Sequence, residues 1–295
     1  MPSLLAIGAG YSVRPLLRRL ADEGWAVTGT TRSEEKADAL RSEGVTALRW
    51  AAPARLPEEV VRTADAIVVS VSPGEEGCPA LHALPEETLR AETRLLYLSS
   101  SGVYGDKDGA WIDETATCTP GTARGRRRLE AEAGWQALAA RVGARLTLCR
   151  LAGIYGPGRN AVESLSGGTR GARSGLSQRV IKPGQVFNRI HRDDIAGGLH
   201  ALLDADAPPG VVNFADDEPS PPQDVIAYAA RLLGVGAPPE VPFEAAEMSD
   251  MARSFYAENK RLRNDQLRSL PAFALRYPTY REGLDAAVRS LRTEA

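Results

Sequence analysis

Two glycines near the N-terminus are the first residues whose spacing points to chemistry. Gly8-Ala-Gly10 follows the apolar run Leu4–Ile7, and the residues Ser12–Asp22 after it have the pattern of a helix. The first glycine permits a tight turn, and Gly10 lets the backbone approach a pyrophosphate that the first amides of the helix would hold. The spacing therefore predicts a dinucleotide-binding turn. We assign to it Gly8, Gly10, Tyr11, Ser12 and Val13.

Val13 stands where the dinucleotide fingerprint has its third glycine. That glycine serves close packing of the helix on the strand. We therefore expect Val13 to displace the helix slightly without abolishing binding. The alternative is a glycine turn in an α/β protein that holds no cofactor.

The end of the second expected strand, Ala26–Thr30, indicates which dinucleotide would bind. An acidic residue there binds the ribose 2′-hydroxyl of NAD, but the sequence continues with Thr31 and Arg32. Hydroxyls and a guanidinium suit a 2′-phosphate, so NADP(H) is favoured over NAD(H). The alternative is that Arg32 is a solvated residue before a helix. Ser70, near the end of the expected strand Ala66–Val71, completes the predicted cofactor set.

A second group is a pair of arginines, Arg124 and Arg128, at the start of a long helical segment. At about 100° per residue, positions 124, 128, 131, 135, 138 and 142 form one stripe, which reads Arg, Arg, Ala, Trp, Leu, Val. We expect both arginines to face inward, and Arg126 and Arg127 to be solvated. A helix N-terminus is a poor place for cations, so an anionic partner is expected. The alternative is pairing with surface carboxylates.

The elements that position these residues alternate between short apolar runs and helical patterns. This alternation predicts a parallel sheet with helices on both faces. We predict a dinucleotide-binding domain of residues 1–160 to which 188–215 return, and a smaller substrate-binding lobe of 161–187 and 216–295. The expected strands are Leu4–Ile7, Ala26–Thr30, Val45–Leu48, Ala66–Val71, Leu95–Ser99, Arg145–Leu151 and Val211–Phe214.

Composition excludes several classes of function. The 295 residues carry a net charge of −2, which gives no global field for nucleic acid or anionic membranes. No window approaches the roughly 18 apolar residues of a membrane span, and the N-terminus does not have the pattern of a secretory signal. The three widely spaced cysteines fit reduced thiols in a cytoplasm better than disulfides or a zinc site.

Motifs along the whole chain resemble one enzyme superfamily. They are GAGYSV, LSSSGVYG, RLAGIYGPGR at 150–159, NRIHRDDIAGGLHALL at 188–203 and VVNFADDEP at 211–219. With these the chain resembles the extended or atypical short-chain dehydrogenase/reductases, that is, the NAD(P)-dependent epimerase/dehydratase superfamily. The resemblance implies a Rossmann-type, doubly wound, seven-stranded and mostly parallel sheet with a small C-terminal substrate lobe. It also allows a homodimer, by analogy only.

The resemblance implies catalytic positions, and the chain matches them only in part. The family's serine or threonine falls on Ser100, whose hydroxyl would donate a hydrogen bond to a substrate oxygen, and Tyr104 would face the cleft. The family's Tyr-x-x-x-Lys pair falls on Arg124 and Arg128. There is no other tyrosine between Tyr104 and residue 155, and no lysine between residues 107 and 182.

The replacement changes the available chemistry. A phenol of depressed pKa passes protons near neutrality, whereas arginine donates hydrogen bonds but stays protonated. Arg128 would reach ribose hydroxyls as the family lysine does. Arg124 would stabilise an oxyanion, or a carboxylate or phosphate of a ligand.

Four further residues are weaker substrate-facing candidates. Tyr155 is either a displaced catalytic acid or a scaffold residue. His191 either titrates near neutral pH at the site or belongs to the segment that closes the cleft, in which Asp194 would tie loops together. Asn188 and Arg189 are expected to face the substrate.

These observations favour an NADP(H)-binding enzyme with oxidoreductase, epimerase or dehydratase-like chemistry on a hydroxylated small molecule, with nucleotide-linked and anionic molecules as the candidate substrates. One alternative is a non-catalytic NADP(H)-binding sensor or partner-binding module. A third is a non-redox isomerase or cyclase in a repurposed cleft.

Overall fold

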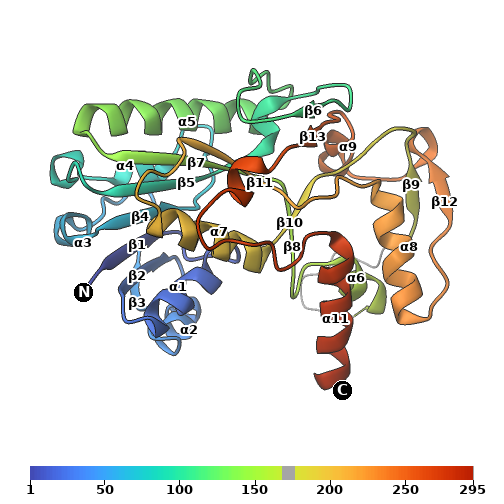
Figure 1. Ribbon diagram of the computed structural model, residues 1–295, viewed down its shortest axis with the longest axis horizontal. Helices are drawn as coiled ribbons and strands as arrows, with labels where there is room; N and C mark the ends of the chain where they lie inside the picture. Colours follow the sequence, from blue (N-terminus) through green and yellow to red (C-terminus); the bar gives the residue numbers. More distant parts are fainter. Residues whose placement is uncertain (168–176, 295) are drawn as a thin grey trace.

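The computed structural model describes residues 1–167 and 177–294, and its centre is one sheet of seven parallel strands (Figure 1). The strand order is β11-β7-β5-β4-β1-β2-β3, and every neighbouring pair runs parallel. This is the doubly wound arrangement, so the predicted fold class is confirmed. The strands are β1 (Ser3–Ile7), β2 (Ala26–Thr31), β3 (Thr46–Arg49), β4 (Ala66–Val69), β5 (Arg94–Ser100), β7 (Arg145–Leu151) and β11 (Val211–Phe214).

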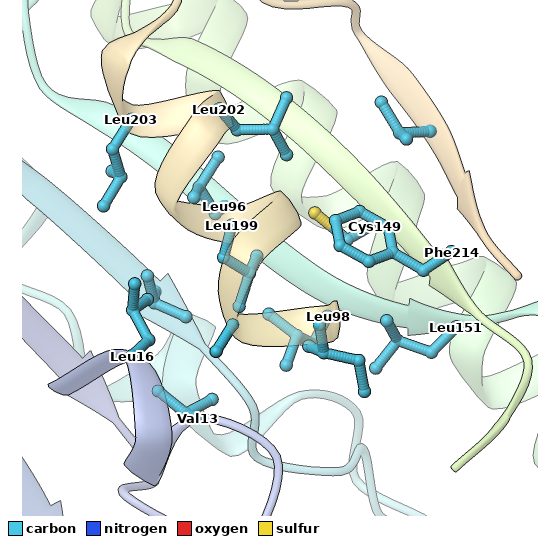
Figure 2. Close-up of a cluster of buried hydrophobic side chains, with 14 of the residues drawn as sticks. Val13, Leu16, Leu96, Leu98, Cys149, Leu151, Leu199, Leu202, Leu203 and Phe214 are labelled. Atoms are coloured by element: carbon cyan, nitrogen blue, oxygen red, sulfur yellow. The ribbon is translucent and has the colours of Figure 1, made fainter. Parts of the chain in front are cut away.

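Helices cover both faces of the sheet because its strands are apolar on both sides. In β1, Leu4 packs into one core cluster and Leu5 into the other. The first cluster lies under α1 (Arg14–Asp22), α2 (Glu34–Arg41) and α7 (Arg192–Asp204). The second lies under α3 (Glu58–Thr63), α4 (Pro79–Ala83) and α5 (Ala123–Val142). Figure 2 shows the first, where Leu199 and Leu202 of α7 meet Leu96 and Leu98 of β5.

A third group of helices lies beside the sheet rather than on it (Figure 1). Helices α6 (Ala161–Ser166), α8 (Pro222–Leu233) and α11 (Tyr280–Glu294) share a separate apolar cluster around Val162, Tyr280 and Leu284. The predicted two-part division of the chain stays a prediction. Within the predicted lobe, Leu267 and Leu270 pack into the core under the sheet instead.

Short elements make up the rest of the described chain. Three two-stranded pairs are parallel: β8 with β10, β9 with β12, and β6 with β13. Their bounds, with those of the remaining helices, are β6 (Trp111–Ile112), β8 (Gly153–Tyr155), β9 (Arg179–Ile181), β10 (Arg189–His191), β12 (Glu240–Pro242), β13 (Arg261–Leu262), α9 (Asp250–Phe255), α10 (Asp265–Arg268), η1 (Glu86–Thr88), η2 (Ser101–Tyr104) and η3 (Phe243–Ala245).

Helix α5 carries the predicted arginines, and its position is set by its buried stripe. Ala131, Trp135 and Leu138 of the predicted stripe are all buried against the sheet. The helix begins after Thr122, whose hydroxyl accepts a hydrogen bond from the Gly125 amide at 3.1 Å. The N-terminal end of α5 therefore lies at the carboxyl end of β5.

A buried ion pair fastens α5 to two strands. Glu132 of α5 accepts two hydrogen bonds from Arg150 of β7, at 3.1 and 2.8 Å, and one from the hydroxyl of Ser99 of β5, at 2.5 Å. The Glu132 and Arg150 side chains are only 3% and 8% exposed. Burial disfavours the charge of Arg150, yet the hydrogen bonds and charge of Glu132 raise its pKa.

Removing one partner of this pair leaves an uncompensated buried charge. We expect R150M to lower the free energy of unfolding by about 3–5 kcal/mol, measured by urea denaturation. The matched control is R62M, which breaks the exposed pair between Arg62 and Glu58 and should cost at most about 1 kcal/mol. Equal losses in the two variants would contradict the anchoring role of the buried pair.

Candidate functional site

The turn at the end of β1 is held open by two hydroxyls. Gly8 has a φ of +94°, and a Cβ there would lie 2.9 Å from the Ser70 Oγ. The Gly8 amide donates to the Thr30 hydroxyl at 2.8 Å, and the Gly8 carbonyl accepts from the Ser70 hydroxyl at 2.5 Å. Around Gly10 no atom lies within 4 Å of the Cβ position. The turn thus has room for a bulky group at Gly10.

Val13 is fully buried and immediately precedes α1. Close approach of the turn and helix to β2 is possible because Gly29 stands there: a Cβ on Gly29 would lie 2.9 Å from Ala9 and 3.3 Å from Leu17. A glycine on the neighbouring strand therefore leaves the space in which these groups pack.

The other predicted cofactor residues surround this turn. Tyr11 donates a hydrogen bond to the Pro157 carbonyl at 3.0 Å, which ties the turn to the loop after β8. Thr31 is buried at the end of β2, and Arg32 beside it is exposed. In the described part of the chain Arg32 forms no ion pair, so its guanidinium is available to a ligand.

A cavity of about 610 Å³ lies past the carboxyl end of β5. A volume of this order suits a small molecule. It is walled by the ends of β5, η2, α5 and β8 and by two segments from later in the chain. Its lining comprises Ser72, Pro73, Ser100, Ser101, Gly102, Thr122, Arg124, Gly125, Arg127, Arg128, Leu151, Ala152, Gly153, Ile154, Tyr155, Val186, Phe187, Asn188, Arg189, Ser254, Phe255, Glu258 and Lys260.

Ser100, Arg124 and Arg128 meet in this cavity, as the sequence predicts. The Ser100 oxygen accepts a hydrogen bond from the Gly102 amide at 3.2 Å, which leaves its proton free to donate. Arg128 donates from Nη1 to the Tyr97 hydroxyl and the Leu98 carbonyl, both at 2.9 Å. Among the described residues neither arginine pairs with a carboxylate, so the surface-pairing alternative is wrong.

Arg124 and Arg127 depart from the predicted exposure. Arg124 is exposed rather than inward, and it lies at the cavity mouth over the Phe255 ring, at 4.8 Å from the ring centroid. Arg127, expected to be solvated, lines the cavity and pairs with Glu75 at 2.8 Å. The buried residue of this first turn is Gly125, since a Cβ there would lie 2.8 Å from the Gly102 carbonyl oxygen. Gly125 therefore faces η2, and its neighbour Arg124 lies at the rim.

Tyr104 does not face the cleft, so that prediction is wrong. Its side chain is fully buried, and its hydroxyl donates to Asn213 at 2.8 Å. The Arg150 guanidinium lies 4.7 Å from its ring centroid. Burial raises the pKa of Tyr104 to about 12. Tyr104 belongs to the buried network behind the site because η2 turns the chain back under the sheet edge.

The weaker candidates are mostly held by the scaffold. Tyr155 lines the cavity, but its hydroxyl donates to the Thr279 carbonyl at 3.2 Å and burial raises its pKa. Asn188 also lines the cavity, yet its amide group bonds the backbone of residues 260 and 262. Arg189 donates to the Ser220 hydroxyl at 2.8 Å.

His191 lies outside the cavity, so its assignment as a substrate-facing residue is wrong. It is 2% exposed, and its Nδ1 accepts the Asp193 amide at 3.1 Å at the start of α7. Asp194 accepts the amides of Arg276 and Tyr277 at 2.7 and 3.1 Å, which confirms that it ties two segments together. Both residues are structural.

Sequence reasoning missed an ion pair in the cavity wall. Lys260 donates to Glu258 at 2.8 Å and to the Gly105 carbonyl at 2.7 Å. Both residues line the cavity, and they join the C-terminal segment to the end of η2. No motif marks them, because only the fold brings together residues that are 155 positions apart, as Lys260 and Gly105 are.

Comparison with protein family models identifies the family to which this sheet and cavity belong. Residues 6–215 match the model of the NAD dependent epimerase/dehydratase family. The chain belongs to this family. Membership confirms the superfamily resemblance, and the fold keeps the family's sheet while the arginines of α5 line the cavity.

Individual relatives agree with this membership. A functionally unknown conserved protein from Silicibacter pomeroyi DSS is 44% identical, with a TM-score of 0.87 over 99% of both chains. The Escherichia coli K12 protein YeeZ is 29% identical over 256 residues, which are 81% of this chain and 86% of YeeZ. The UDP-glucuronic acid 4-epimerase of Bacillus cereus shares the fold, with 15% identity and a TM-score of 0.74 over 99% of this chain and all of its own.

The described residues contain neither a membrane-spanning helix nor a metal-binding cluster. No helix between residues 1–167 or 177–294 is long and apolar enough to cross a membrane. Within the same ranges, no three His, Cys, Asp or Glu side chains form a group that could hold a metal ion.

The buried histidine of this family member predicts a pH effect on stability. Burial lowers the pKa of His191 to about 4, from 6.5. The unfolded chain therefore takes up a proton at this residue as the pH falls below 6.5, and the folded chain only near 4. Relative to H191N, the wild type should lose up to about 1.4 kcal/mol of unfolding free energy per pH unit across this window.

Urea denaturation at several pH values between 7 and 4 measures this difference, with H82N as the control. A constant difference between wild type and H191N over the window would show that His191 titrates in the folded protein as it does in the unfolded chain.

Proposed function

We propose that this protein is an NADP(H)-dependent enzyme with redox, epimerase or dehydratase-like chemistry on a hydroxylated small molecule. The observation that carries the proposal is the position of Ser100. Its hydroxyl lines a cavity at the carboxyl edge of the sheet that also carries the open glycine turn. Ligands of doubly wound sheets bind at this edge. Family membership supports the same reading.

The residues present fit a dinucleotide. Gly10 leaves free space beside the first amides of α1, and Gly8 adopts the φ that the turn requires. When bound, the nicotinamide would supply hydride transfer. Ser70 and Thr30 fix the shape of the turn, and Thr31 and Arg32 would contact the ribose phosphate. The full set that would hold the cofactor is Gly8, Gly10, Tyr11, Ser12, Val13, Thr31, Arg32, Ser70 and Arg128.

In the substrate cavity Ser100 would donate a hydrogen bond to a substrate oxygen, and Arg124 would face a charged or oxygen-rich group. Arg128 would hold ribose hydroxyls while fixed to the strand end by Tyr97 and Leu98. Neither arginine can pass a proton. Among the described side chains of the cavity wall, Glu258 and Lys260 supply a carboxylate and an ammonium group, and the Tyr155 hydroxyl donates to the Thr279 carbonyl.

A second candidate function is a non-catalytic NADP(H)-binding sensor. It is favoured by the arginines at the helix positions where a catalytic phenol and ammonium would stand. Ser100, with a proton free to donate into the cavity, favours the enzyme.

Cofactor selectivity tests the nucleotide end. We expect NADPH to bind more tightly than NADH, and R32A to reduce the preference about tenfold or more because a charge-assisted contact to the 2′-phosphate is lost. Fluorescence titration of the reduced nicotinamide measures both. R41M is the control, since Arg41 is exposed and pairs with Glu34 and Asp38 on α2. Equal affinity of the wild type for both cofactors would refute the assignment.

Turnover tests the substrate end. A panel of hydroxylated acids and nucleotide-linked sugars with NADP⁺ or NADPH should give an absorbance change at the reduced nicotinamide band. We expect S100A to lower kcat by about 10²-fold, because a hydrogen-bond donor to the reacting oxygen is lost. S100T, which keeps the hydroxyl, should retain most of the rate. Turnover unaffected in S100A would remove Ser100 from the mechanism.

A further inference from the structure

The cavity wall carries more positively than negatively charged side chains, and only some of them have a charged partner. Five cations and one carboxylate line it. Lys260 pairs with Glu258 at 2.8 Å. Burial lowers the pKa of Arg189, and the nearby Asp216 carboxyl opposes this effect. Arg124 and Arg128 contact only neutral groups among the described residues. The charged side chains that α5 adds to the lining are therefore all cationic. The nearest lining carboxylate is that of Glu258, whose Oε1 has no hydrogen-bond partner among the described residues and lies 3.9 Å from the Cβ position of Gly121, just before the helix.

The first turns of α5 concentrate this excess. Arg124 and Arg127 both stand there, no acidic residue occupies the first turn, and a helix N-terminus already bears partial positive charge. Cations at that place repel the helix dipole unless an anion lies near them. An anion at the cavity mouth would relieve this repulsion.

Contacts from distant segments hold the two guanidinium groups at the mouth. Arg124 donates to the Ser254 hydroxyl at 3.1 Å and stacks over Phe255, both from α9. Phe255 is 53% exposed, which is unusual for a phenylalanine and leaves its ring free to support the arginine. Arg127 already binds one carboxylate, that of Glu75 at 2.8 Å. Glu75 is 85% exposed, so a ligand can displace it.

We propose that Arg124 and Arg127 form an oxyanion-binding subsite at the mouth of the cavity, with Glu75 as a built-in competing carboxylate. The subsite takes a carboxylate or phosphate group of the substrate, whose remaining part extends toward Ser100. It rests on the proposed function for the identity of that substrate, but the binding of a simple anion does not depend on cofactor binding or turnover.

The test is calorimetric titration of inorganic phosphate and of malonate into the protein at low ionic strength. R124M and R127M should each weaken binding of the preferred anion by about tenfold, because a charge-assisted contact is lost. R126M is the matched control, since Arg126 lies between them, bonds the Gly121 carbonyl and is absent from the cavity wall. It should leave binding within about twofold of the wild type.

A gain of affinity provides the sharper test, because misfolding cannot produce it. E75Q should tighten anion binding, since it frees Arg127 from its internal partner. E76Q makes the same change of net charge at the adjacent exposed residue and should not. Tighter binding of phosphate than malonate, or the reverse, assigns the group that the subsite prefers.

Three results would overturn the proposal. They are the absence of phosphate and malonate binding at millimolar concentration, equal weakening by R126M, and equal effects of E75Q and E76Q. NADPH titrations of the same variants separate the two proposals. If no variant and no wild-type sample binds NADPH, the proposed function fails while the anion subsite is still judged by its own data.

Discussion

The ion pair between Glu132 and Arg150 is the constraint on which the site depends. It joins the middle of α5 to the adjacent strands β5 and β7, and Ser99 adds a third hydrogen bond from the strand that ends in Ser100. The strand that presents the serine and the helix that presents the arginines are thereby fixed to each other. Such a pair is costly to bury and strongly destabilising to break. Its value here lies in orientation, because a shift of α5 would separate the two side chains and leave a buried charge without its partner.

The same network explains why the tyrosine after Ser100 serves the scaffold. The Arg150 guanidinium is shared between Glu132 on one side and the Tyr104 ring on the other, and the Tyr104 hydroxyl reaches Asn213 on β11. Three neighbouring strands and one helix are therefore linked by polar contacts at the edge of the sheet where the cavity begins. A phenol placed inside such a network is desolvated, so its pKa rises and it is a poor acid near neutrality.

The sheet could be predicted from the sequence because burial on both faces leaves continuous apolar runs such as Ala66–Val69. The turn at Gly8 could also be predicted, because its positive φ is a backbone conformation that few residues other than glycine adopt. The stripe from Ala131 to Leu138 followed from helical periodicity. The exposed position of Arg124 did not, because Gly125 is the residue that packs against Gly102, and that contact depends on the path of η2. Periodicity describes one helix and carries no information about its neighbours.

The cavity wall was least predictable where it is built from the C-terminal third of the chain. Lys260, Glu258 and Phe255 carry no local pattern, yet they meet residues near 105 and 124. Their presence changes how the α5 arginines are understood. A tyrosine–lysine pair would serve proton transfer, whereas guanidinium groups carry charge and only donate hydrogen bonds, which suits charge recognition. If protons move in this cavity, the chain must carry them on groups supplied by another part of the fold. Charge recognition on α5 and proton chemistry on the neighbouring C-terminal segment, where Glu258 and Lys260 pair, would then be separate tasks.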